Sequence, residues 1–133
     1  MNSDDRQRFE QQRGYFEQAL VRLGEVLQVA ENEIVRDALI QRFEFTHEMA
    51  WKTMFRFLVS KGERVAAKAW DVLPLAFQSQ LVADAGTWER MRAMRNDMSH
   101  EYDRAKAVAV AAFVRDKAYP AMLALQAELQ RRA

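Results

Sequence analysis

Glycine and proline are scarce in this chain, and that scarcity limits the folds it can adopt. Its 133 residues include four glycines and two prolines. Folds rich in β-sheet, such as β-sandwiches and Rossmann-type domains, need many tight turns, and turns depend on these two residues. The chain also holds 21 alanines against 16 β-branched residues, a balance that favours helices over strands. We therefore expect a single all-α domain, residues 1–133, built from a few long helices.

Apolar residues recur at helical spacing along most of the chain. Asn32 and Asp103 are typical N-cap residues, and Gly62 follows the second apolar stripe, where a C-cap glycine is expected. The pattern predicts helices at about 3–30, 32–61, 71–82, 87–99 and 103–132. Asp71 and Thr87 are expected as further N-caps. Gly86 is expected to separate two helices, and Pro120 to kink the last one. Four to five such helices favour an up-down helical bundle.

Charge and composition exclude several classes of protein. Lysine and arginine number 20 against 19 aspartates and glutamates, so no broad basic surface for nucleic acid is expected. Without cysteine, the chain has no disulfide, thiolate metal site or cysteine nucleophile, and its two histidines argue against a zinc site. We expect neither a metal nor a cofactor. Because no apolar run approaches the ~20 residues of a membrane span, and none follows the charged N-terminus, we expect a cytoplasmic protein with no membrane contact.

One segment of nine residues, which starts at Arg95, concentrates reactive side chains. Arg95 suits phosphate, His100 titrates near neutrality and Tyr102 offers a hydroxyl, a set that can handle phosphate without a metal. In an unbroken helix Arg95 and His100 would point about 140° apart, so they converge only if the helix ends before His100. The alternative is a solvated turn in which Arg95 pairs with Asp97 or Glu101, and spacing alone favours this alternative.

The predicted second helix carries another group of polar residues. Glu44 and Glu48 lie one turn apart, like a carboxylate pair. A solvated helix face explains them equally well, with Glu48 and Lys52 forming an ordinary i,i+4 ion pair. His47 borders the apolar stripe, and we expect a hydrogen-bonded histidine in the core or at its boundary.

Two runs of this sequence resemble those of a known family. Arg95-x4-His100-x-Tyr102 resembles the R-x4-H-x-Y signature of the HEPN superfamily. Residues 43–52, FEFTHEMAWK, are similar to the F-E-x-T-x-E-x-x-W-K run of its nucleotidyltransferase substrate-binding protein branch. Further matches are Gly62, the pair Ala76-Phe77 and Trp88. The resemblance extends from about residue 8 to about residue 130.

This resemblance implies a helical bundle that forms a homodimer with a cleft at the interface, and a separate minimal nucleotidyltransferase as its partner. In the related HepT toxins, the motif arginine and histidine act in metal-independent RNA cleavage. There the nucleotidyltransferase serves as antitoxin and adenylylates the motif tyrosine. Carried over to this chain, the catalytic residues would be Arg95 and His100. The residues for binding or modification would be Asn96, Tyr102, Glu44, Glu48, Trp51 and Lys52.

The 43–52 run belongs to the substrate-binding branch, which orders the expected functions. We expect first an accessory substrate-binding subunit that works with the nucleotidyltransferase as a toxin–antitoxin-like pair and binds nucleotide or RNA. The alternative is a HepT-like metal-independent ribonuclease that adenylylation of Tyr102 neutralises. A third interpretation is a bundle that only dimerises, in which Arg95→Ala and Tyr102→Phe would change neither partner binding nor activity.

Overall fold

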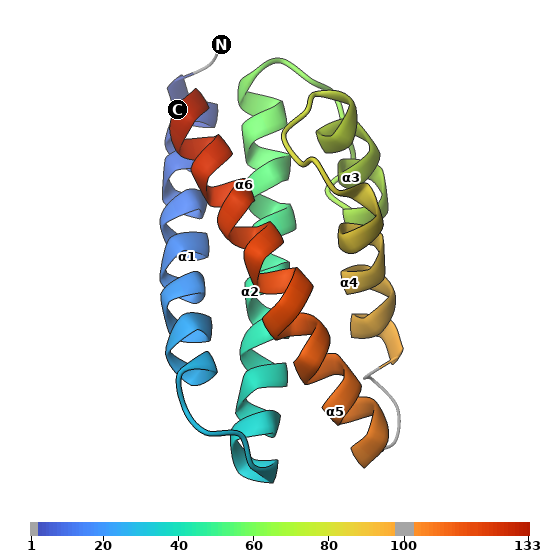
Figure 1. Ribbon diagram of the computed structural model, residues 1–133. Coiled ribbons are helices and arrows are strands. Elements are labelled where there is room, and N and C mark those ends of the chain that lie inside the picture. Colours follow the sequence, from blue (N-terminus) through green and yellow to red (C-terminus); the bar gives the residue numbers. More distant parts are fainter. Residues whose placement is uncertain (1–2, 98–102) are drawn as a thin grey trace.

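Two long helices form the framework of the molecule. The computed structural model describes residues 3–97 and 103–133, and all regular elements within these ranges are helical. The first two, α1 (Ser3–Leu27) and α2 (Glu33–Ser60), lie side by side and run in opposite directions (Figure 1). The all-α bundle expected from the sequence is confirmed.

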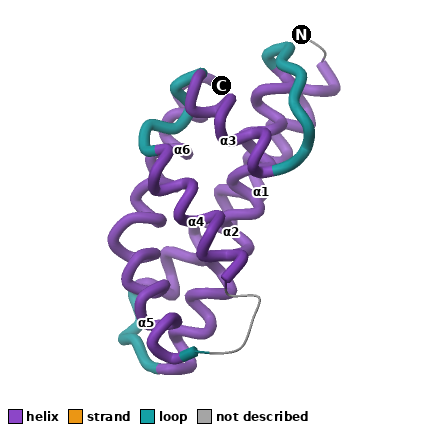
Figure 2. The backbone as a smooth tube through the Cα atoms, turned by 90° about the vertical axis from the view of Figure 1, so that its right-hand side faces the viewer, coloured by secondary structure: helices purple, strands orange, loops and turns teal. Residues whose placement is uncertain are grey.

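The remaining helices pack against this pair. The short α3 (Ala69–Gln78) and α4 (Ala85–Asp97) lie beside α2, and α3 contacts both α2 and α4. The last long helix consists of α5 (Arg104–Phe113), the π-helical turn η1 (Val114–Ala118) and α6 (Tyr119–Arg132). It crosses α1 and α2 obliquely in Figure 1, and Figure 2 shows it as a layer of its own on one side of them.

Three of the predicted helix caps are confirmed. The Asn32 side chain accepts a hydrogen bond from the Val35 N–H at 2.8 Å, and the Asp103 carboxylate accepts one from the Ala105 N–H at 2.9 Å. Each satisfies a backbone N–H that the first helical turn leaves without a partner. Gly62 follows α2 with φ of 89°, the left-handed conformation that glycine adopts without strain.

The predicted starts of α3 and α4 are wrong. Asp84, which we had not expected as a cap, accepts hydrogen bonds from the Thr87 N–H at 3.0 Å and the Thr87 hydroxyl at 2.6 Å. Because this carboxylate lies earlier in the chain, α4 begins before Thr87, and Gly86 belongs to its first turn. Likewise, Asp71 lies in the first turn of α3, and the residue before that helix makes no side-chain cap hydrogen bond.

The apolar stripes of the helices meet in one core that draws on each of the helices described. Between α1 and α2, two buried threonines of α2, Thr46 and Thr53, occupy positions where apolar side chains would be expected. The Thr46 hydroxyl donates to the Arg42 carbonyl at 2.7 Å and lies 3.3 Å from the Ala19 carbonyl of α1. A threonine bonded to its own helix buries its hydroxyl without an unmet hydrogen bond, so the two helices can approach closely.

The regular α-helical pattern of the last helix is interrupted near Pro120, as the sequence predicts, but α5, η1 and α6 follow one another without a loop. Proline lacks the N–H that an α-helix needs four residues after an acceptor, and the π-helical turn η1 directly precedes α6. Next to this turn Tyr119 reaches α1 at Gly24, where a Cβ would lie 2.7 Å from the tyrosine hydroxyl. The glycine therefore lets the two helices cross closely.

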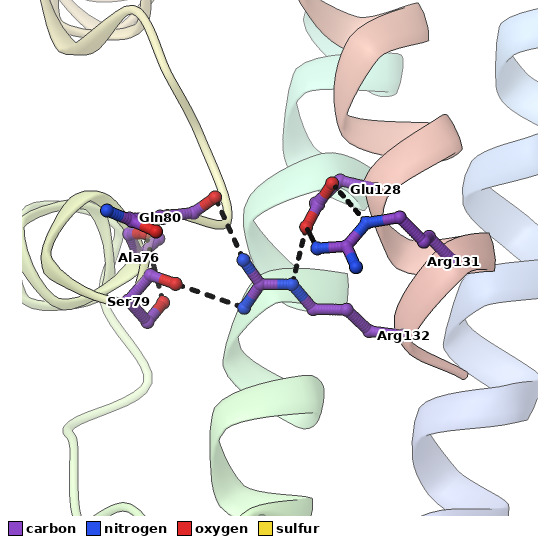
Figure 3. Close-up of polar contacts among 6 residues, drawn as sticks. All are labelled: Ala76, Ser79, Gln80, Glu128, Arg131 and Arg132. Atoms are coloured by element: carbon purple, nitrogen blue, oxygen red, sulfur yellow. Dashed lines mark hydrogen bonds and ion pairs between the residues drawn. The ribbon is translucent and has the colours of Figure 1, made fainter.

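The end of α6 is hydrogen-bonded to the chain just after α3 (Figure 3), at the end of the molecule where α1 begins (Figure 1). Arg132 donates to the carbonyls of Ser79 and Gln80, both at 3.0 Å, and to Glu128 at 2.6 Å. Hydrogen bonds from Arg131 and then Arg132 lower the pKa of Glu128 to about 2. This contact satisfies carbonyls that the end of α3 leaves free. None of the described helices is both long and apolar enough to span a membrane.

Candidate functional site

Helix α2 presents three of the predicted site residues on one face. Glu44, Glu48 and Trp51 follow one another at intervals of four and three residues, the spacing that places side chains above one another on a helix. The Trp51 indole N–H donates to Glu48 Oε2 at 3.3 Å. This hydrogen bond holds the carboxylate of Glu48 in a defined position.

Helix α4 brings Arg95 to this face. Its Nη1 lies 3.2 Å from Glu48 Oε2, the same oxygen that accepts from Trp51. The two sequence runs that resemble the family therefore meet in space, although 47 residues separate Glu48 from Arg95. The side chains of Arg95 and Glu48 are 33% and 24% exposed, so a dissolved anion can reach the guanidinium.

The ion pair expected between Glu48 and Lys52 does not account for these two residues. Glu48 pairs with Arg95 of another helix, and the expected i,i+4 pair with Lys52 is not formed. The Lys52 ammonium lies instead 6.0 Å from the centre of the Trp51 ring, a cation–π contact. Lys52 and Arg95 thus flank the Glu48–Trp51 pair, and they add positive charge to a face that also carries Glu44 and Glu48.

His47 lies directly behind this face, inside the core. Its ring centroid is 6.2 Å from that of Phe43 and 6.3 Å from that of Trp88, and the residue is 1% exposed. The expected burial is confirmed. The expected hydrogen bond is wrong, because neither ring nitrogen has a partner among the residues that the structure describes.

Burial and nearby charges change two pKa values at the site. Burial raises the pKa of Glu44, and the positive charge of Arg95 opposes that change in part. Burial, together with the positive charges of Arg95 and Arg92, lowers the pKa of His47 to about 4, and Glu48 acts in the opposite direction. His47 is therefore neutral near pH 7, and a proton on it would be repelled by Arg95.

The rest of the R-x4-H-x-Y motif is described only in part. Asn96 belongs to α4, directly after Arg95. His100 and Tyr102 lie outside the described residues, as does Glu101, the other carboxylate considered for Arg95 beside Asp97. Within residues 3–97 and 103–133, no three acidic or histidine side chains are grouped so that they could hold a metal ion.

Comparison with known proteins assigns the chain to a family. Residues 8–131 match the family model described as "Nucleotidyltransferase substrate binding protein like". The chain belongs to this family. The matched residues include both helices that form the Glu48–Arg95 pair.

Two relatives extend the comparison of this substrate-binding family member. A Haemophilus influenzae protein named "Probable ribonuclease HepT" is 38% identical over 91 residues, which cover 62% of this chain and 62% of that protein. A crystal structure of a protein from Thermus thermophilus superimposes with a TM-score of 0.71 at 30% identity, over 88% of this chain and 97% of the other. The helical fold is therefore shared with a solved structure.

The structure adds a link within this family member's site that the sequence did not indicate. The pairing of Glu48 with Arg95 depends on how α4 packs against α2, and no local spacing reports it. The nearest signal was the resemblance itself, since both residues fall in its matched runs. Arg92, which contributes to the charge around His47, carried no signal beyond its position one turn before Arg95.

Proposed function

We propose that this chain is the accessory substrate-binding subunit of a two-component nucleotidyltransferase, and that it acts with a separate minimal nucleotidyltransferase as a toxin–antitoxin-like pair. The observation that carries the proposal is the Glu48–Arg95 ion pair, which joins the 43–52 run to the start of the R-x4-H-x-Y motif. The family match over residues 8–131 supports it.

Arg95 is the group we assign to the phosphate of a bound nucleotide. Arginine binds phosphate through a planar fork of N–H donors, and one edge of this guanidinium meets Glu48. Glu48, held by Trp51, orients the guanidinium and competes with an incoming anion for it. Binding of a phosphate at Arg95 would thus displace or share the contact with Glu48, while Lys52 supplies further positive charge.

The partner is tested by affinity purification from the cells that produce this protein. The tagged wild-type chain should retain a small nucleotidyltransferase, identified by mass spectrometry of the eluate. Arg95→Gln should reduce its recovery at least about fivefold if the ion-paired face is part of the contact or of substrate binding. Arg64→Gln, which removes the same charge from an exposed connection between α2 and α3, should leave recovery unchanged.

Absence of any small nucleotidyltransferase from the wild-type eluate would contradict the proposal. Equal loss in Arg64→Gln and Arg95→Gln would show that the effect is one of net charge alone. Circular dichroism of each variant verifies that the helices are intact.

The relative named "Probable ribonuclease HepT" favours a second candidate function, metal-independent RNA cleavage. In this proposal Arg95 and His100 act at the phosphodiester, and adenylylation of Tyr102 by the nucleotidyltransferase neutralises the activity. Attack by a ribose 2′-hydroxyl needs a base for that proton and an acid for the leaving oxygen. A homodimer would bring two copies of His100 and Arg95 to one cleft.

The ribonuclease candidate predicts a growth defect. Induced expression of the wild-type chain should slow a bacterial host, His100→Ala should relieve that effect, and Arg64→Gln should not. Coexpression with the nucleotidyltransferase should add one or more adenylyl groups to the intact mass, and Tyr102→Phe should abolish the addition. Equal growth of wild type and His100→Ala, together with intact RNA after incubation in vitro, rules this candidate out.

A further inference from the structure

A groove of about 400 Å³ lies between α1 and α2. It is lined by two small residues, Ala19 of α1 and Ala38 of α2, and by polar and aromatic side chains of the same two helices. The groove lies where α2 meets α1, whereas Glu48 and Arg95 join α2 to α4. It is thus a different surface from the candidate site, and its volume is within the range of small-molecule sites.

Two arginines, Arg22 of α1 and Arg42 of α2, line this groove. Arg42 of α2 donates from Nη1 to the backbone carbonyl of Arg22 at 2.7 Å, which fixes its guanidinium over α1. Within the described part of the chain, the ion pairs formed by arginine do not include Arg22 or Arg42. Guanidinium groups that form no ion pair keep their N–H donors available to an anion in the groove.

An aromatic ring and an amide complete the wall. Phe45 is 56% exposed, unusually open for a phenylalanine, and it follows Gln41 by one helical turn. An exposed aromatic face beside arginines favours a flat ring that stacks on it. The Gln41 amide offers both a donor and an acceptor to the edge of such a ring.

We propose that this groove is a second binding site, and that its ligand is a nucleotide. Arg42 and Arg22 hold the phosphate, Phe45 stacks on the base, and Gln41 bonds to the base edge. The argument uses neither Arg95 nor the R-x4-H-x-Y motif, so it is independent of the proposed function. The same chemistry is offered by a free nucleotide and by one nucleotide of a single strand.

Titration with AMP, followed by calorimetry and by amide chemical shifts of the full chain, tests the proposal. AMP should shift the amide signals of residues 19–22 and 38–46. Arg42→Gln should weaken AMP binding at least about tenfold, while the charge-matched control Arg64→Gln should bind as wild type. Phe45→Ala should weaken AMP binding at least about fivefold and leave the binding of inorganic phosphate unchanged, because phosphate has no ring to stack.

A short oligoadenylate identifies the source of the ligand. Tighter binding than AMP, still dependent on Arg42, indicates a strand, and equal binding indicates a free nucleotide; both support the site. Equal AMP affinity of Arg42→Gln and Arg64→Gln overturns it. A smaller sedimentation coefficient for Phe45→Ala than for wild type also overturns it. Such a result would show that Phe45 holds a second copy of the chain over the groove. Loss of AMP binding in Arg95→Gln alone would place the nucleotide at the candidate site instead.

Discussion

Replacing Trp88 with alanine should lower the free energy of unfolding by about 3–5 kcal/mol, the usual cost of removing a large buried aromatic side chain. Trp88 is 2% exposed and is among the largest of the buried side chains. Its ring also packs beside His47. Since a domain of this size is stabilised by only about 5–15 kcal/mol, the variant should lose a large fraction of its stability and unfold at a clearly lower urea concentration. Urea denaturation followed by far-ultraviolet circular dichroism measures the change without relying on tryptophan fluorescence.

Trp70 provides the matched control on the neighbouring helix α3. It is 61% exposed, so Trp70→Ala removes the same atoms but little buried area, and its stability should change by less than about 1 kcal/mol. Trp88→Phe should fall between the two, because part of the ring remains in place. Similar unfolding midpoints for Trp88→Ala and Trp70→Ala would contradict the burial of Trp88.

The position of Trp88 also connects stability to the candidate site. Trp88 and Arg95 are seven residues apart on α4 and thus share one face of that helix. Trp88 fixes this face in the core while Arg95 reaches Glu48 of α2 at its other end. A variant such as Trp88→Phe that stays folded but loosens α4 should therefore weaken the Glu48–Arg95 contact as well.

The sequence predicts most reliably those features that are decided within one helical turn. Asn32 and Asp103 accept hydrogen bonds from N–H groups two or three residues later, and Gly62 adopts a backbone conformation that few other residues tolerate. These signals are local, and all three caps are confirmed. The prediction of Thr87 as an N-cap is wrong because Asp84, three residues earlier, also has a capping side chain. The sequence pattern alone does not decide between two such nearby caps.

Pairings between helices depend on packing, which the sequence does not report directly. The sequence names Asp97 and Glu101 as candidate partners for Arg95, and neither side chain is among those described; the structure adds a contact with Glu48 on α2. Similarly, the spacing of Glu48 and Lys52 permits an ion pair, yet the carboxylate of Glu48 accepts hydrogen bonds from Trp51 and Arg95. The residues of the site could be named from the motif, but their mutual contacts required the fold.

Lowering the pH from about 7.5 to about 5 should destabilise this protein through His47 by about 2 kcal/mol. In the folded state the pKa of His47 is lowered from an ordinary value of 6.5 to about 4. Burial is the main cause, Arg95 and Arg92 act in the same direction, and Glu48 acts in the opposite direction. Below pH 6.5 the unfolded chain therefore binds a proton that the folded chain does not, and unfolding becomes more favourable. The stabilising contribution is complete above pH 6.5 and is lost as the pH falls toward 4.

His47→Leu isolates this contribution, because leucine fills a similar volume between Phe43 and Trp88 and carries no titratable group. Between about pH 7.5 and pH 5 its unfolding free energy, from urea denaturation, should fall by about 2 kcal/mol less than that of wild type. Two control variants measure the contributions of other titrating groups. His100→Gln removes the other histidine. Glu44→Gln removes a carboxyl whose raised pKa acts in the opposite direction, because it makes the folded state more stable as the pH falls. If wild type and His47→Leu lose stability in parallel, the pKa of His47 is not lowered in the folded protein, and the prediction is wrong.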